Sequence, residues 1–83
     1  MTIVNALGLH ARAAARFVEL AARFRSQIRV TRGARTIDGK SILGLLLLAA
    51  ARGMSITISA SGDDEAAAME ALTALVARGF EDA

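Results

Sequence analysis

The sequence contains no cysteine, proline, tryptophan or tyrosine, and it has a single histidine. Without cysteine the chain forms neither a disulfide bond nor a thiolate metal site, and one histidine excludes a multi-histidine metal site within it. We therefore expect no metal and no cofactor. The longest apolar run, Ile42–Ala51, has ten residues, about half of what a membrane-spanning helix needs.

The chain is short but strongly apolar. It has 83 residues, of which 54% are hydrophobic. This composition argues against disorder, and the length favours a single domain over residues 1–83. No charged-then-apolar leader opens the sequence, so we expect a cytoplasmic protein with no membrane insertion.

Charge is small in sum but uneven along the chain. Ten Lys and Arg against eight Asp and Glu give a net charge of +2, which is not typical of a strong nucleic-acid binder. Sheet-based RNA readers stack bases on aromatic strand residues, and Phe17, Phe24 and Phe80 all fall outside the expected strands, so we expect no nucleic-acid partner. Seven arginines lie between Arg12 and Arg35, and a positive first half suits an acidic partner or a phosphoryl group.

The hydrophobic pattern predicts the element order βαββαβα. Each expected strand has one apolar face, which indicates an α+β fold with a mainly antiparallel four-stranded sheet, covered on one side by three helices. The expected strands are 2–5, 27–32, 35–38 and 55–59, and the expected helices run over 10–23, from Ser41 to Leu48 or slightly beyond, and from about 63 to 78.

Helix-end residues support these boundaries. Ser41 is a good N-cap for the second helix, and we expect Arg52–Gly53 to close it. Asp63, Asp64 and Glu65 place negative charge in the first turn of the third helix, where the helix dipole favours it. Arg78–Gly79–Phe80 is typical of a C-terminal stop.

His10 is the first candidate for chemistry because it falls at the start of the first expected helix. Backbone N–H groups at a helix N-terminus are unpaired and favour an anion. Arg12 adds forked donors that suit phosphate oxygens. Neutral imidazole offers the lone pair that a phosphoryl acceptor needs, and phosphoryl transfer depends mostly on positioning and charge. The alternative is a histidine that only caps the helix or lies on the surface.

Three segments carry a resemblance to a known family. Gly8-Leu9-His10-Ala11-Arg12, followed by Ala14-Ala15 and Phe17, resembles the active-site signature of the histidine-containing phosphocarrier (HPr) family of the phosphoenolpyruvate-dependent phosphotransferase system. Asp38–Leu45 resembles the signature around the family's regulatory serine, and Ile56–Glu65 resembles its last strand and the entry to its last helix. Together the segments span essentially the whole chain.

The resemblance implies a specific function. The fold would be an open-faced β-sandwich. His10 would accept a phosphoryl group on Nδ1 from phospho-Enzyme I and pass it to an Enzyme IIA component, while Arg12 would stabilise the phosphoryl oxygens. The protein would then be a stoichiometric carrier rather than an enzyme, and we expect it to be a monomer.

Two departures from the family pattern bear on this expectation. Ala13 stands where the family usually has proline, which is favoured in the first helical turn; we expect alanine to keep the helix and the function. Leu7 stands where the sugar-transport members often have a polar residue. Asn5–Gly8 and the ending Arg78–Asp82 are more similar to the nitrogen-related branch, so sugar transport and nitrogen regulation both remain open.

Ser41 has two interpretations. As a helix cap it needs no further explanation. In the family that the chain resembles, the matching serine can be phosphorylated by an HPr kinase/phosphorylase. The negative charge of a phosphate would repel partners that present acidic groups to this helix.

The second expected helix is more apolar than a core requires. At helical spacing Ile42, Leu43, Leu46 and Leu47 form one face, which indicates either a partner-docking surface beside His10 or a deeply buried helix. The expected partner-binding residues also include Lys40 and, as a basic rim, Arg16 and Arg23, because such rims speed encounters with a partner.

Other function classes remain to be weighed. The runner-up is an HPr-like regulatory module that binds partners according to its phosphorylation state. An independent hydrolase or metalloenzyme has no support, because the sequence has no thiol, no arguable carboxylate pair, and no second histidine to serve Ser41 as a base.

Overall fold

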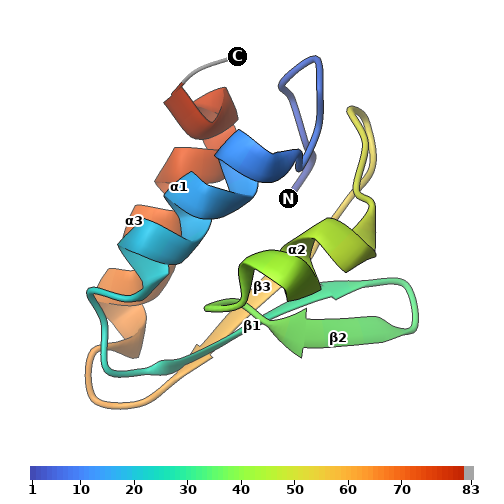
Figure 1. The fold of residues 1–83 in the computed structure, drawn as a ribbon. Coiled ribbons are helices and arrows are strands. Elements are labelled where there is room, and N and C mark those ends of the chain that lie inside the picture. The colour runs from blue at the N-terminus through green and yellow to red at the C-terminus, as the bar shows by residue number, and fades with distance from the viewer. Residues whose placement is uncertain (82–83) are drawn as a thin grey trace.

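The computed structural model describes residues 1–81 and has an α+β fold (Figure 1). Three α-helices and three strands follow one another, and a short 3-10 helix, η1, ends the described chain. In chain order they are α1 (Ala11–Ala21), β1 (Gln27–Arg32), β2 (Arg35–Asp38), α2 (Ile42–Leu48), β3 (Thr57–Ser61), α3 (Glu65–Ala77) and η1 (Gly79–Glu81).

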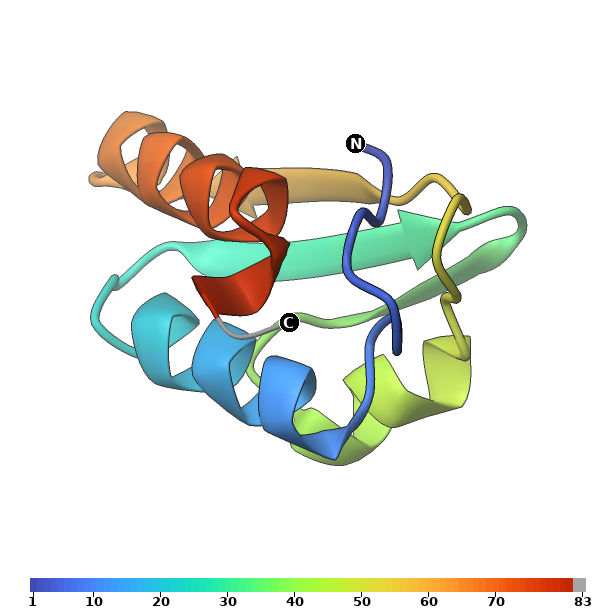
Figure 2. The same cartoon turned by 90° about the horizontal axis from the view of Figure 1, so that it is seen from above.

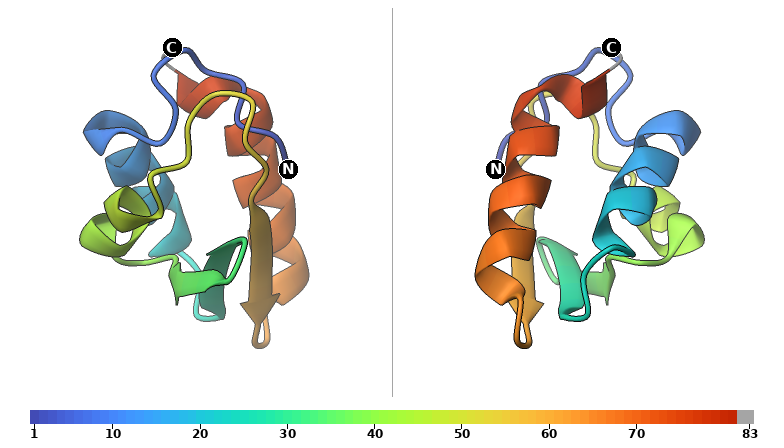
Figure 3. Two further views of the ribbon diagram at one scale, coloured as in Figure 1. Left: turned by 90° about the vertical axis from the view of Figure 1, so that its right-hand side faces the viewer. Right: turned by 90° about the vertical axis from the view of Figure 1, so that its left-hand side faces the viewer.

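The sheet has the strand order β2-β1-β3, and both pairings are antiparallel. β1 and β2 form the hairpin that the sequence predicts, with the Gly33–Ala34 turn between them. Alternate residues of β1 face the core, because Ile28 and Val30 are fully buried whereas Gln27 and Arg29 are exposed. The helices cover the apolar face: α2 packs over β2 and α3 runs along β3 (Figure 3).

The prediction of four strands is wrong, because the segment at residues 2–5 does not form a strand. It makes an isolated bridge, Thr2 with Ser55, which lies outside the three strands. The pairing then becomes irregular: Ile3 N–H donates to the Met54 carbonyl at 2.9 Å, while the Ile3 carbonyl accepts from Gly53 N–H at 2.8 Å. Ile3 thus pairs with two successive residues, as at a bulge, and the ladder stops.

The bounds of β3 and α2 also differ from the sequence prediction, and α1 and α3 are each shorter than predicted. β3 begins at Thr57 and continues to Ser61, which pairs with Gln27. α2 ends at Leu48, because Ala49 adopts a left-handed conformation with φ 53°; Arg52–Gly53 therefore does not close this helix.

Arginines from the hairpin satisfy the last carbonyls of α2. The Arg32 guanidinium donates to the Leu48 carbonyl at 2.8 Å, and the Arg35 guanidinium donates to the Leu47 carbonyl at 2.7 Å. Helix carbonyls at a C-terminus have no partner within the helix, so these contacts fix α2 on the hairpin.

The core lies between the helices and the sheet, and α1 contacts both α2 and α3 (Figure 2). Phe17 of α1, Leu45 and Leu48 of α2 and Leu72 of α3 are at most 1% exposed. Phe80 is buried with them, because Gly79, at φ 65°, turns the chain back after α3. The predicted stop at Arg78–Gly79–Phe80 is therefore confirmed. Within residues 1–81, no helix has the length and apolar character to cross a membrane.

Candidate functional site

His10 is the N-cap residue of α1. Its backbone is extended, with φ −80° and ψ −179°, and its carbonyl accepts the first helical hydrogen bond, from Ala14 N–H at 2.8 Å. Its Nδ1 accepts a hydrogen bond from Arg12 N–H at 3.2 Å. The lone pair of Nδ1 is thus directed at the N-terminal N–H groups of the helix, which is where an anion is favoured.

A tight loop before α1 places His10. Leu9 is buried, and its N–H donates to the Ala50 carbonyl at 2.8 Å. Gly8 adopts φ +66°, and a Cβ atom there would lie 2.5 Å from the Ala50 oxygen. Only glycine fits this approach, because the backbone is left-handed and the chain that follows α2 lies directly against it.

Arg12 and Ala13 lie in the first turn of α1. Arg12 is exposed, within one helical turn of the imidazole. Ala13 is buried and lies inside a regular helix that begins at Ala11. The expectation that alanine keeps the helix in place of the usual proline is therefore confirmed.

Ser41 is the N-cap residue of α2, as the sequence predicts. Its Oγ accepts a hydrogen bond from Gly44 N–H at 3.0 Å. The neighbouring Lys40 ammonium donates to the Phe24 carbonyl at 2.7 Å. Lys40 therefore ties the start of α2 to the loop that follows α1, in addition to any role toward a partner.

The apolar face of α2 is exposed. Leu43 is 67% and Leu47 is 58% exposed, and Ile42 and Leu46 are also exposed, whereas Leu45 and Leu48 are fully buried. The helix is thus not deeply buried, and one side of it is an unpaired apolar surface. We name Ile42, Leu43, Leu46 and Leu47 the α2 patch.

Leu7 was not among the predicted site residues. It is 72% exposed and lies in the turn between Asn5 and Gly8, directly before the loop that carries His10. The signal in the sequence is a large apolar residue between turn residues, where water-exposed side chains are usually small or polar.

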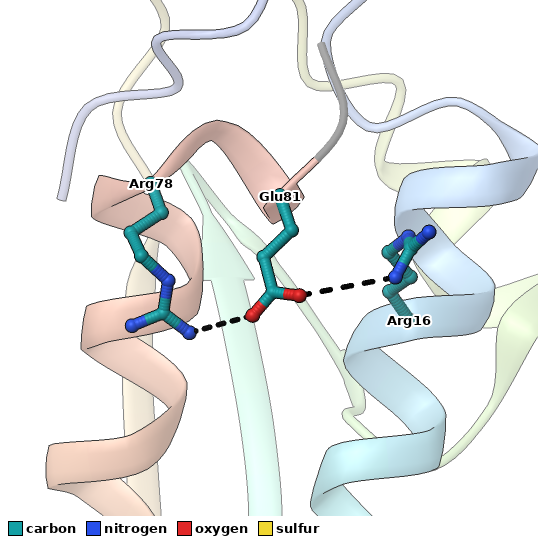
Figure 4. Close-up of polar contacts among 3 residues, drawn as sticks. All are labelled: Arg16, Arg78 and Glu81. Atoms are coloured by element: carbon teal, nitrogen blue, oxygen red, sulfur yellow. Dashed lines mark hydrogen bonds and ion pairs between the residues drawn. The ribbon is translucent and has the colours of Figure 1, made fainter.

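The structure places Arg16 and Arg23 along a groove between α1 and α3 of about 320 Å³. Glu81 of η1 lies between two guanidinium groups there, 2.9 Å from Arg78 Nη2 and 3.9 Å from Arg16 Nη1 (Figure 4). Arg16 thus faces η1, whereas the α2 patch lies on another helix.

The described part of the chain shows no cluster of side chains suited to a metal ion, at His10 or elsewhere. Residues 1–81 contain no group of three or more His, Asp and Glu side chains placed to hold a metal ion. The charged groups nearest to His10 in sequence are the arginines of α1.

The comparisons with known proteins agree with this geometry. Residues 1–78 match the family model described as the PTS HPr component phosphorylation site. The phosphocarrier protein HPr of Cupriavidus necator is 49% identical over 79 residues, which cover 95% of this chain and 89% of that protein. The phosphocarrier protein NPr of Shewanella violacea is 42% identical over 83 residues, which cover 100% of this chain and 91% of that protein.

A solved structure shows the same fold. The crystal structure of HPr-C-His from Thermoanaerobacter tengcongensis superposes with a TM-score of 0.95 at 41% identity, covering 100% of this chain and 93% of that one. These matches define the class as phosphocarrier proteins of the phosphotransferase system. The chain belongs to the HPr family.

Proposed function

We propose that this chain accepts a phosphoryl group on His10 from phospho-Enzyme I and passes it to an Enzyme IIA component. The observation that carries the proposal is the direction of the His10 Nδ1 lone pair, which points at Arg12 N–H and the helix N-terminus. A phosphoryl group bound to Nδ1 would lie at the N-terminal backbone donors of α1, within one helical turn of Arg12.

The phosphoryl transfer needs no cofactor, because the one bond that forms is matched by one bond that breaks. The Nδ1 lone pair of His10 attacks phosphorus, the new P–N bond forms, and the P–N bond of the donor phosphohistidine breaks with its electron pair returning to the donor imidazole. A phosphoryl oxygen then replaces Nδ1 as the acceptor for Arg12 N–H. The helix N-terminus is thus capped before and after transfer, and the second transfer reverses these steps toward Enzyme IIA.

The partners would dock on the α2 patch. Its exposure beside α1 supports this proposal, because contiguous exposed apolar surface marks interaction sites. Arg16 and Arg23 line the groove between α1 and α3 rather than the edge of the α2 patch, so their charges would attract acidic groups of the partner during the encounter, which raises association rates more than affinity. Lys40 would contribute its charge at the start of α2.

Ser41 is proposed as a regulatory phosphorylation site of an HPr kinase/phosphorylase. It directly precedes the α2 patch, so a phosphoserine would add negative charge at the edge of the docking surface. The capping role of Ser41 explains its presence equally well, and the modification is therefore an additional proposal.

The decisive experiment is phosphorylation by purified Enzyme I and phosphoenolpyruvate, followed by intact mass at mildly alkaline pH, because a phosphoramidate hydrolyses in acid. The native chain should gain one phosphoryl group and His10→Ala none, while Ser41→Ala serves as the matched control and should be phosphorylated normally. If a cognate Enzyme I adds no phosphoryl group to the native chain, the carrier proposal is wrong and the regulatory module is favoured instead.

A further inference from the structure

Asn5 is one of only two buried polar residues among residues 1–81, the other being Ser26. It is 3% exposed, and its Nδ2 donates a hydrogen bond to the Gly8 carbonyl at 2.7 Å. Its Oδ1 is buried and has no hydrogen-bond partner. A buried amide that leaves one half unpaired lowers stability relative to an apolar side chain of the same shape, so packing alone does not account for asparagine here.

The Gly8 carbonyl connects Asn5 to His10. The same oxygen that accepts from Asn5 Nδ2 also accepts from His10 N–H at 2.9 Å. The Asn5 carbonyl in turn accepts from Gly8 N–H at 3.1 Å. Asn5 therefore makes hydrogen bonds to both the N–H and the carbonyl of Gly8, and this carbonyl also accepts a hydrogen bond from the His10 N–H.

The opposite side of this loop is held by a separate contact, the Leu9 N–H to the Ala50 carbonyl. With Asn5 on one side and Ala50 on the other, the peptide groups that precede His10 are fixed in orientation. The capping geometry of His10 depends on that orientation, because its extended backbone directs Nδ1 toward Arg12 N–H.

We propose that Asn5 is a positioning residue for phosphoryl transfer, which acts through the Gly8 carbonyl to keep His10 Nδ1 aimed at the helix N-terminus. The inference rests on the proposed function and deepens it. In neutral imidazole one nitrogen accepts and the other carries the proton, so the contact from Arg12 N–H keeps the proton on Nε2. Asn5 thus also selects the tautomer in which Nδ1 is nucleophilic.

The test compares Asn5→Leu with the native chain. Leucine has nearly the same shape, removes the donor to Gly8, and also removes the unpaired oxygen, so the melting temperature should change little. Ser26→Ala is the matched control, because it removes the other buried polar side chain at the far end of α1. Asn5→Ala, which removes the donor to Gly8 without placing a new polar group at this buried position, is the second variant should leucine fail to fold.

Two measurements are made on each variant. Nitrogen NMR shifts of the His10 ring report the tautomer in the unphosphorylated protein and require no partner. Steady-state transfer from Enzyme I reports kcat and KM with the carrier as substrate. We expect Asn5→Leu to shift the ring toward a tautomer mixture and to lower kcat by about tenfold or more with KM unchanged, since the α2 patch is intact, whereas Ser26→Ala should leave both unaltered.

An unchanged tautomer in the Asn5 variants overturns the inference, and so does a raised KM with kcat unaltered, which would indicate a docking effect. If the native chain takes no phosphoryl group, the proposed function fails, and the ring shifts still decide whether Asn5 orients His10.

Discussion

The carboxylate of Asp64 accepts hydrogen bonds from the backbone N–H of Ser26, at 2.9 Å, and from its hydroxyl group. The same carboxylate accepts from Arg25 N–H at 2.8 Å. Although Asp64 directly precedes α3, its side chain makes no capping bond to that helix. It instead joins the start of α3 to the loop that follows α1.

The hydrogen bonds that the Asp64 carboxylate accepts predict a loss of stability in acid. The Ser26 hydroxyl, followed by the Arg25 N–H, lowers the pKa of Asp64 from 3.8 to about 2. A carboxyl whose pKa is lower in the folded than in the unfolded state stabilises the fold above its unfolded pKa, and the gain is lost as the pH falls through its folded pKa. The melting temperature should therefore decline between about pH 4 and pH 2.

Asp64→Asn is the variant that checks this source of acid sensitivity. It should melt at a lower temperature than the native chain at neutral pH and show a flatter dependence on pH in the same interval. Asp63→Asn, which changes an exposed neighbour, is the control. Parallel pH profiles for Asp64→Asn and the native chain would contradict the prediction.

Gly8→Ala should destabilise the protein and displace His10. The left-handed backbone costs an alanine about 1–2 kcal/mol, and the added Cβ would lie 2.5 Å from the Ala50 oxygen. We expect the free energy of unfolding in urea to fall by more than about 2 kcal/mol. Gly53→Ala is matched, because Gly53 also has a positive φ but no atom within 4 Å of its Cβ position; equal losses in the two variants would show that the contact with Ala50 is unimportant.

Arg12→Ala should slow phosphoryl acceptance without unfolding the chain, because Arg12 is exposed. A hydrogen bond to a charged group contributes about 1.5–3 kcal/mol, so the expected loss in kcat/KM with Enzyme I is about tenfold to a hundredfold. Arg12→Lys should recover part of the rate, since lysine keeps the charge but not the forked donors. If Arg12→Ala accepts the phosphoryl group with the same kcat/KM as the native chain, Arg12 takes no part in the transfer.

Leu47→Glu should weaken docking and leave the fold intact. Leu47 is 58% exposed, so the melting temperature should stay within a few degrees, while a charge in the centre of an apolar interface raises KM with Enzyme I about tenfold or more. Val4→Glu, an exposed apolar position outside the α2 patch at 48% exposure, is the control. Equal KM values for the two variants would argue that partners dock elsewhere.

Ser41→Ala separates the two roles of Ser41. Loss of the bond from Gly44 N–H should lower the free energy of unfolding by about 1 kcal/mol and leave phosphorylation of His10 unaltered. A kinase that modifies the native chain but not this variant would support the regulatory site, whereas unchanged stability would contradict the capping role.

Local sequence patterns predicted the elements that depend on near neighbours. The Gln27–Arg32 and Arg35–Asp38 strands, the Ser41 cap and the stop at Gly79 all follow from alternation, capping and turn preferences within a few residues. Helical spacing also grouped the residues of the α2 patch on one face, but it left open whether that face is exposed or buried, and the structure shows that it is exposed.

Features that depend on contacts between distant parts of the chain could not be predicted from local sequence patterns. The segment at 2–5 has a strand pattern, but its ladder is interrupted where Ile3 meets both Gly53 and Met54. The last turn of α2 depends on Arg32 and Arg35. The alternating pattern placed both residues in strands but did not indicate that their guanidinium groups bond to α2. Asn5 could not be recognised from its neighbours either, because its burial depends on how the chain returns at Gly79.

The turn at Gly33–Ala34 joins β1 and β2 at the far end of the hairpin, is exposed, and has nothing within 4 Å of the Gly33 Cβ position. Because the sequence contains no cysteine, one thiol introduced at Ala34 would be chemically unique. A fluorophore attached there would lie on the β1–β2 hairpin rather than on α1 or α2. The carrier could then be followed by anisotropy as it binds and leaves each partner, with the native His10 and its surroundings untouched.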